Sequence, residues 1–192
     1  HAQGVALAAQ RLGSHALIVM PVTTPRIKIE AVERLGGEAL LYGGDYAAAA
    51  GHALALAEAR GLSFVHPYDD PLVIAGQGTI GAELLRQLQG PCDAIFVPVG
   101  GGGLIGGIAA WYGGRIRIVG VEPEAAPTLH MALQAGEPVD APAGGIAADS
   151  LAPLRVGMLM FPIAQAHVDR VVLVTDAAIG EAQRVLWDRL RL

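Results

Sequence analysis

The sequence has almost no cysteine and little positive charge. Cys92 is the only cysteine among 192 residues, so one chain can form neither a disulfide framework nor a thiolate zinc site. Lysine and arginine number 13 against 18 acidic residues and form no cluster, which excludes the basic surface that nucleic-acid binding requires. Apolar residues come in runs far shorter than the roughly 20 needed to span a bilayer. These absences predict a cytoplasmic protein with neither a nucleic-acid nor a membrane partner.

The chain also lacks a start signal. It opens on His1 with neither an initiator methionine nor a charged-then-apolar leader, and it ends abruptly at Leu192. We therefore expect a fragment of a longer polypeptide. Hydrophobic residues make up 53% of the chain, which is enough to build the core of one large domain or two small ones.

Helical and strand patterns alternate along the whole chain. Strands are expected at 16–20, 39–42, 62–65, 94–97, 116–121 and 171–174, with helices between them and a long loop at 134–148. Such alternation predicts an α/β fold with parallel sheets whose faces are covered by helices. The polar turn at 66–71 contains His66, Asp69 and Asp70 between two prolines, and we interpret it as a connection between domains rather than a metal or acid–base site.

Four consecutive glycines stand between a predicted buried strand and a predicted helix. They are Gly100, Gly101, Gly102 and Gly103. Without side chains, several backbone N–H groups can converge on one anion at the N-terminus of the helix. A tight turn needs only one or two glycines, so the run favours a phosphate-binding loop.

The same loop also fits a dinucleotide fingerprint. Gly101, Gly103 and Gly106 stand in G-x-G-x-x-G order, and Glu122 ends the following strand. That fingerprint usually opens the first unit of its domain, whereas here a complete α/β block precedes the loop. The motif alone leaves both a nicotinamide dinucleotide and another phosphate-bearing ligand open.

Several segments occur in the order typical of one enzyme family. They lie at 1–4, 19–28, 75–79, 120–123, 146–151 and 187–189, and the strongest is Val97-Pro98-Val99-Gly100-Gly101-Gly102-Gly103-Leu104. Together they resemble the serine/threonine dehydratases and the related serine racemases, which are pyridoxal-phosphate enzymes of fold type II. The resemblance covers nearly the whole chain, and we prefer it to the dinucleotide hypothesis.

The resemblance implies a fold, a reaction and partners. The fold would be the tryptophan-synthase-β-like one, with two three-layer αβα domains. Residues 1–70 would form the small substrate-side domain, and 71–192 part of the large cofactor-binding domain. The parent enzyme would convert L-serine or L-threonine to a 2-oxo acid and ammonia by β-elimination, with racemisation as a near relative. A small amino-acid substrate, pyridoxal 5′-phosphate and a homodimer would be its partners.

The resemblance also assigns roles to individual residues. The glycine run and the amide of Leu104 would hold the cofactor phosphate. The family's cofactor-binding lysine would precede His1, and Lys28, the only lysine, falls on a helix well after that position. We therefore expect no catalytic residue in this chain and no activity from it alone. A non-catalytic phosphate-binding module and a dehydrogenase domain are the alternatives.

Two further groups of candidates follow from the resemblance. His1, Asp149 and Ser150 would lie at the substrate or cofactor face. Glu122 and the carbonyl of Ala126 would be ligands of Mg²⁺ or Ca²⁺, although the second acid of that site is Thr128 here.

Overall fold

The computed structural model describes residues 1–151 and 153–191. The chain divides into two compact units, His1–Pro67 and Tyr68–Leu192. Helices alternate with strands in both units and all strand pairs described are parallel, which confirms the α/β class with parallel sheets. Among the described residues, no helix combines the length and the apolar character needed to cross a bilayer.

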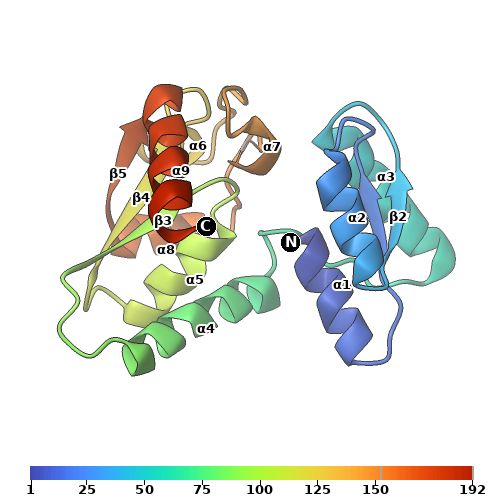
Figure 1. Cartoon of the computed structure of the whole chain (residues 1–192), viewed down its shortest axis with the longest axis horizontal. Coiled ribbons are helices and arrows are strands. Elements are labelled where there is room, and N and C mark those ends of the chain that lie inside the picture. Colours follow the sequence, from blue (N-terminus) through green and yellow to red (C-terminus); the bar gives the residue numbers. More distant parts are fainter. Residues whose placement is uncertain (152, 192) are drawn as a thin grey trace. The chain divides into compact units, whose positions relative to one another are not determined.

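The first unit is a two-stranded parallel sheet between helices. Its elements are α1 (Ala2–Arg11), β1 (Leu17–Met20), α2 (Arg26–Arg34), β2 (Glu38–Leu41) and α3 (Tyr46–Arg60). Figure 1 shows α1 and α2 in front of the two strands and α3 behind them. Ala6, Met20 and Val32 are buried where α1, β1 and α2 meet. The carboxylate of Asp45 caps α3, accepting a hydrogen bond from the Ala48 amide at 2.9 Å.

The strand predicted at 62–65 is wrong. The segment forms no strand, and Leu62 and Val65 are 48% and 43% exposed. A short apolar run becomes a strand only where a neighbouring strand supplies hydrogen bonds, and the described sheet of this unit ends at β2.

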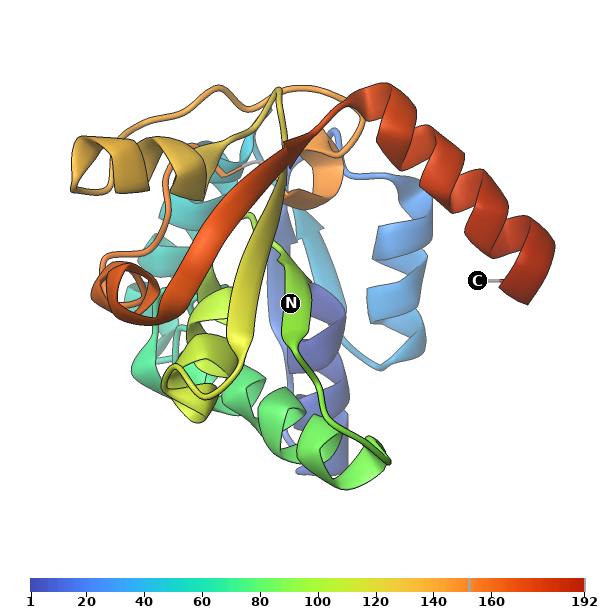
Figure 2. The same ribbon diagram turned by 90° about the vertical axis from the view of Figure 1, so that its left-hand side faces the viewer.

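The second unit has a three-stranded parallel sheet in the order β3-β4-β5. Its elements are α4 (Pro71–Gln87), β3 (Ala94–Pro98), α5 (Gly103–Tyr112), β4 (Arg117–Pro123), α6 (Thr128–Ala135), α7 (Ala148–Leu151), α8 (Phe161–His167), β5 (Val168–Val174) and α9 (Asp176–Leu190). Figure 2 shows α4, α5 and α8 gathered on one side of this sheet and α9 on the other. Val97 and Ile118 from the sheet, Ile105 from α5 and Phe161 from α8 share one buried cluster.

Helices α4 and α5 approach closely at two glycines. A Cβ atom at Gly107 would overlap the Ile74 carbonyl oxygen and would lie 2.6 Å from the Gly78 amide nitrogen. Because both groups belong to the α4 backbone, neither could move without displacing the helix. The start of α5, and with it the glycine loop, is therefore fixed by helix packing.

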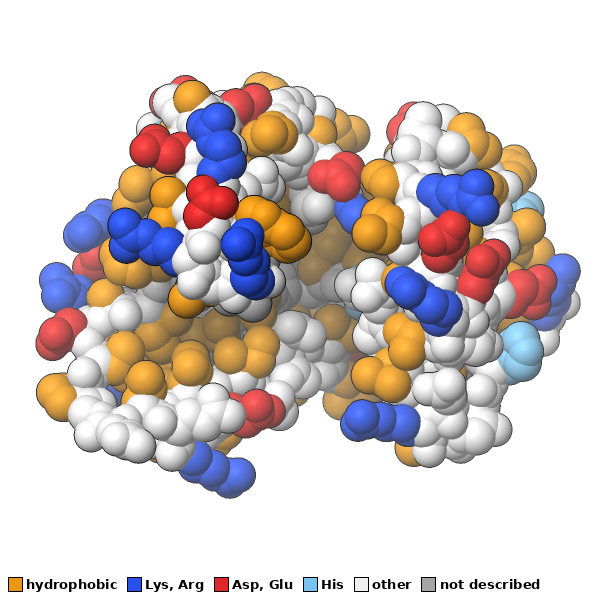
Figure 3. All heavy atoms as spheres, in the orientation of Figure 1, with side chains coloured by type: hydrophobic (Ala, Val, Ile, Leu, Met, Phe, Trp, Pro, Cys, Tyr) orange, Lys and Arg blue, Asp and Glu red, His pale blue; other side chains and the backbone are white. Residues whose placement is uncertain are grey.

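The far face of the three-stranded sheet carries exposed apolar side chains. Phe96 on β3 is 65% exposed and Val172 on β5 is 37% exposed. Helix α9 has no fully buried residue, and its Trp187 is 58% exposed. Figure 3 shows apolar side chains in a hollow below α9 on the surface of this unit. The face of the sheet that packs against α5 is thus more deeply buried than the far face.

The turn at 66–71 is held by its two aspartates. Asp70 accepts hydrogen bonds from the Leu72 and Val73 amides at 2.8 and 3.1 Å and so caps α4. Asp69 accepts from the amides of Met158 and Leu159 at 3.0 and 2.8 Å. These bonds join the turn to the second unit, and the two compact units divide between Pro67 and Tyr68. The division into a substrate-side and a cofactor-binding domain at residue 70 stays a prediction.

Candidate cofactor-phosphate site

The glycine run forms the loop between the end of β3 and the start of α5 (Figure 1). Gly102 has φ +88°, a backbone conformation that favours glycine, and it is the N-cap of α5. Gly102 and Gly103 are buried, while Gly100, Gly101 and Leu104 are partly buried. The loop therefore brings bare backbone to a largely desolvated position at a helix N-terminus.

The carbonyl groups of this loop are turned into the protein. Those of Gly100, Gly101 and Gly102 each accept one hydrogen bond. The donors are, in order, the hydroxyl of Thr128 (2.8 Å), the amide of Gly157 (3.0 Å) and the amide of Gly106 (2.8 Å). Each carbonyl of the loop's three central peptides is thus tethered by a different part of the second unit.

The amide groups of the same loop have no protein partner among the described residues. They are the N–H groups of Gly100, Gly101, Gly102, Gly103 and Leu104. In a planar trans peptide the N–H points opposite to the preceding C=O, so tethering a carbonyl inward turns the next amide outward. Buried amides without an acceptor are rare, and the positive end of the α5 dipole adds to their field. This donor set suits a phosphate group.

Packing behind the loop explains why three of its positions need glycine. A Cβ atom at Gly101 would overlap the ring of Tyr68, and one at Gly102 would lie 2.5 Å from Met160 Cε. At Gly100 a Cβ atom would lie 3.2 Å from the backbone of Leu151. The missing side chains would therefore point at protein.

Helix α7 lies beside the loop and carries two of the predicted residues. Its Leu151 backbone faces Gly100, and Asp149 and Ser150 immediately precede it. The Ser150 hydroxyl donates to Asp149 Oδ1 at 3.1 Å. The structure thus brings this polar pair to the neighbourhood of the loop, and its contact with a cofactor or substrate stays a prediction.

Glu122 and Thr128 form a buried polar pair next to the loop, and both are 0% exposed. Glu122 Oε1 lies 2.8 Å from Thr128 Oγ1 and accepts from the Leu129 amide at 2.7 Å, while Oε2 accepts from the His130 amide at 2.8 Å. Burial raises the pKa of Glu122 above its ordinary value, and the two amides lower it without cancelling that effect.

The predicted Mg²⁺ or Ca²⁺ site finds no support. Both carboxylate oxygens of Glu122 already accept hydrogen bonds from the start of α6, and Ala126 is fully buried. Within the described part of the chain, no three His, Cys, Asp or Glu side chains come close enough together to hold a metal ion. The buried carboxylate is equally unavailable to the ribose hydroxyls of a dinucleotide, which removes the acidic element of that fingerprint.

Two predicted residues belong to the first unit. His1 Nε2 lies 3.1 Å from the Val65 carbonyl oxygen. Lys28 is in the first turns of α2. The assignment of His1 to a cofactor face remains a prediction, as does the absence of a catalytic role for Lys28.

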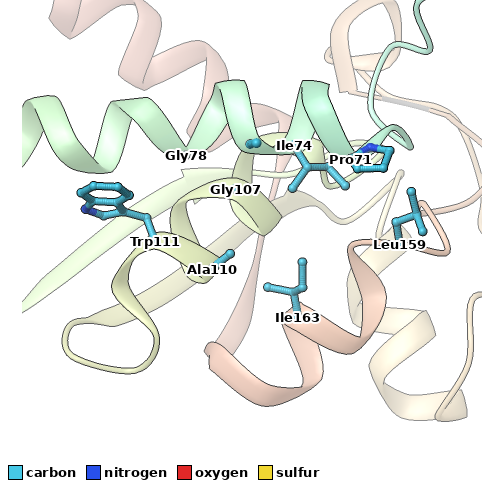
Figure 4. Close-up of a pocket in the computed structure, with 9 residues that line it drawn as sticks. Pro71, Ile74, Gly78, Gly107, Ala110, Trp111, Leu159 and Ile163 are labelled. Atoms are coloured by element: carbon cyan, nitrogen blue, oxygen red, sulfur yellow. The ribbon is translucent and has the colours of Figure 1, made fainter.

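An apolar hollow of about 600 Å³ lies elsewhere in the second unit, between α4, α5 and the start of α8. Figure 4 shows Ile74 and Pro71 above it, Trp111 at one end and Leu159 at the other. The nine described residues that line it carry no charge, so it does not suit a phosphate. The glycine loop is the better candidate for an anion.

Sequence reasoning missed three residues that shape the loop. Tyr68 and Met160 pack against it, and Thr128 tethers it. No sequence signal marks Met160. Thr128 follows Pro127 at the start of a predicted helix, which could have indicated a hydroxyl near a helix end but not the carbonyl it reaches.

A family model described as "Pyridoxal-phosphate dependent enzyme" matches residues 1–192. The chain belongs to this family. It is 50% identical to a biosynthetic chloroplastic threonine dehydratase of Arabidopsis thaliana and 48% identical to a biosynthetic L-threonine dehydratase of Burkholderia multivorans. These matches cover 100% and 98% of this chain and 33% and 38% of those proteins. The chain thus spans about a third of the length of these relatives.

Solved structures of the family share the fold. The processed threonine deaminase isoform 2 of Solanum lycopersicum superposes with a TM-score of 0.91 at 46% identity, and maize serine racemase with 0.92 at 34%. Both alignments cover 100% of this chain, and they cover 53% and 59% of those chains. The chain therefore has the fold type II arrangement of these enzymes over part of their length.

Proposed function

We propose that the glycine loop binds the phosphate of pyridoxal 5′-phosphate and that the parent protein deaminates L-threonine or L-serine. One observation carries this proposal: three carbonyls of the loop accept protein hydrogen bonds, whereas five of its amides have no acceptor in the described part of the chain. Consecutive backbone donors at a helix N-terminus suit the oxygens of one phosphate group. The threonine dehydratases among its relatives support the choice of reaction.

The residues of this chain would bind and orient rather than react. When bound, the cofactor supplies the electron sink for loss of the α-proton and the β-hydroxyl of the amino acid, which yields a 2-oxo acid and ammonia. The loop amides would fix the phosphate end, and the buried surroundings of Gly102 and Gly103 would exclude water from it. Asp149 and Ser150 on α7 would lie near the bound group.

We further propose that the 192-residue chain binds the cofactor without turning over substrate. Its only lysine, Lys28, lies on α2 of the first unit, away in sequence from every segment of the loop. A lysine is the residue through which enzymes of this family hold the cofactor covalently. The homodimer and the preference between serine and threonine remain predictions.

The test uses pyridoxamine 5′-phosphate, because its amine cannot react with Lys28 or with the terminal amine. We expect calorimetric titration to show binding of pyridoxamine 5′-phosphate, competition by inorganic phosphate, and no detectable binding of pyridoxamine. The parent protein should release ammonia from L-threonine or L-serine. Binding of NADH without binding of pyridoxamine 5′-phosphate would contradict the proposal.

A further inference from the structure

The three tethers of the glycine loop differ in kind. Gly101 and Gly102 are held by backbone amides, whereas Gly100 is held by the side chain of Thr128. The first two tethers follow from the path of the chain. The third depends on one hydroxyl group, and Thr128 is fully buried.

The Thr128 hydroxyl is itself fixed by Glu122. The carboxylate reaches from the end of β4 to the start of α6, where the N-cap residue Pro127 offers no side-chain hydrogen bond. Glu122 takes the place of an N-cap side chain by accepting from the Leu129 and His130 amides, and it contacts Thr128 Oγ1 as well. A buried carboxylate is costly unless its hydrogen bonds are made, so this arrangement locks the first turn of α6 in place.

The consequence for the loop follows from peptide geometry. The Gly100 carbonyl and the Gly101 amide belong to one planar peptide and point in opposite directions. When Thr128 holds the Gly100 oxygen at 2.8 Å, the Gly101 N–H must point away from Thr128. Loss of the hydroxyl would let this peptide rotate, because glycine permits a wide range of backbone angles.

We propose that Glu122 and Thr128 are positioning residues of the phosphate site. Thr128 has one hydroxyl proton, so it donates to the Gly100 carbonyl when the protonated Glu122 carboxyl donates to Thr128 Oγ1. Glu122 then holds Thr128, and Thr128 aims the Gly101 amide through the Gly100 carbonyl. The inference rests on the proposed phosphate-binding function of the loop. It adds that the direction of one donor, the Gly101 amide, is fixed by Glu122 and Thr128, which do not themselves touch the ligand.

The test compares Thr128→Val, Thr128→Ser and Thr79→Val in the whole 192-residue chain. Thr128→Val keeps the shape and removes the hydroxyl, and Thr128→Ser keeps the hydroxyl. Thr79→Val is the matched control, because the Thr79 hydroxyl also donates to a backbone carbonyl, that of Gly76 at 2.7 Å, on an exposed part of α4. Thr128→Ala replaces Thr128→Val if the valine variant does not fold.

We expect Thr128→Val to weaken binding of pyridoxamine 5′-phosphate roughly tenfold, the size of one lost charge-assisted hydrogen bond. Thr128→Ser should stay within about threefold of the parent chain, and Thr79→Val should be unchanged. In amide NMR spectra, phosphate should shift the Gly101 resonance less in Thr128→Val than in the parent chain, while the Gly103 shift is retained. A merely structural role would not single out Gly101.

Two failures can be told apart. If the unmutated chain binds neither pyridoxamine 5′-phosphate nor inorganic phosphate, the proposed function is wrong. If the unmutated chain binds and a folded Thr128→Val or Thr128→Ala variant binds equally well, the positioning role is wrong while the phosphate site stands. Equal weakening by Thr128→Ser and Thr128→Val would also overturn it, because the hydroxyl would then not be the active group.

Discussion

The two units of the chain bury their side chains to different depths. In the first, the core cluster consists of three small or medium side chains, Ala6, Met20 and Val32. In the second, one cluster runs through the sheet, α5, α6 and α8, and it includes several side chains with no exposed surface. Two predicted residues, His1 and Lys28, belong to the first unit, whereas the glycine loop packs against the buried core of the second.

This difference shows what an anion-binding site made of backbone amides requires. Buried backbone amides without an acceptor are energetically unfavourable until an anion binds. The surrounding protein must therefore hold the loop in its conformation against that energetic cost. In the second unit, the tethers to Thr128, Gly157 and Gly106 and the packing of Tyr68 and Met160 provide this support. The contrast predicts that changes to the residues that support the glycine loop in the second unit alter phosphate affinity and that changes in the first unit alter stability alone.

The largest effect is expected from Gly107→Ala. The new Cβ atom would overlap the backbone of α4, so α4 and α5 must separate, at a cost of about 3 kcal/mol in the free energy of unfolding. Phosphate affinity should fall with it, because α5 begins at the loop. Urea unfolding followed by circular dichroism measures the first quantity and calorimetry the second.

Gly76→Ala on α4 is the matched control for Gly107→Ala. A Cβ atom at Gly76 meets nothing within 4 Å, and alanine favours the helix by about 1 kcal/mol. The control should be at least as stable as the parent chain. Equal stability of the two variants would show that the close approach of α4 and α5 is not essential.

A smaller effect is expected from Val32→Ala in the first unit. Val32 is 0% exposed, and its truncation should lower the free energy of unfolding by about 2 kcal/mol. Val22→Ala, at a position 60% exposed, should change it by less than about 0.5 kcal/mol. Neither variant should change the affinity for pyridoxamine 5′-phosphate more than about twofold. A tenfold loss of affinity in Val32→Ala would contradict the division of roles between the two units.

The next prediction concerns the contact between Gly101 and Tyr68. In Gly101→Ala the methyl group would overlap the Tyr68 ring, so the loop must shift and affinity for pyridoxamine 5′-phosphate should fall at least roughly tenfold, or about 1.4 kcal/mol. Adding Tyr68→Ala should restore part of that loss, because the obstacle is a side chain. Calorimetry on the two single variants and the double variant gives the coupling. If the losses of affinity in the two single variants are additive, the Gly101→Ala methyl group weakens binding by blocking the ligand directly and not by overlapping Tyr68.

The architecture was largely predictable from the sequence, because strands in a parallel sheet are continuous apolar runs and helices carry clear caps. Asp45, at the start of α3, is such a cap. The structure of segment 62–65 was not predictable from the sequence, because its apolar residues follow the pattern of a strand but find no neighbouring strand. Periodicity reports the preference of a segment, and pairing depends on the rest of the fold.

The candidate site was predictable in position but not in construction. Four glycines marked the loop because their local signal is strong. The inward tethers were not visible, since Thr128 follows Gly100 by 28 residues and Gly157 follows Gly101 by more than 50. Glu122 was assigned to a metal from the family resemblance, and only its contacts with the α6 amides show a helix cap instead.

The smallest effect is expected from the ionisation of Glu122, because the α6 amides offset part of the effect of burial on its pKa. Its pKa in the folded chain is raised, so the folded state keeps this proton over a pH range in which the unfolded state has lost it. The contribution of protonated Glu122 to the free energy of unfolding is therefore complete below the ordinary pKa of 4.5. It is lost as pH rises through the raised pKa of the folded state. Urea unfolding at a series of pH values should show the parent chain losing stability relative to Glu122→Gln as pH rises. Glu83→Gln, at an exposed position on α4, controls for the substitution itself. A gain of the parent over Glu122→Gln with rising pH would mean that the amides outweigh burial and that the buried carboxyl group is ionised.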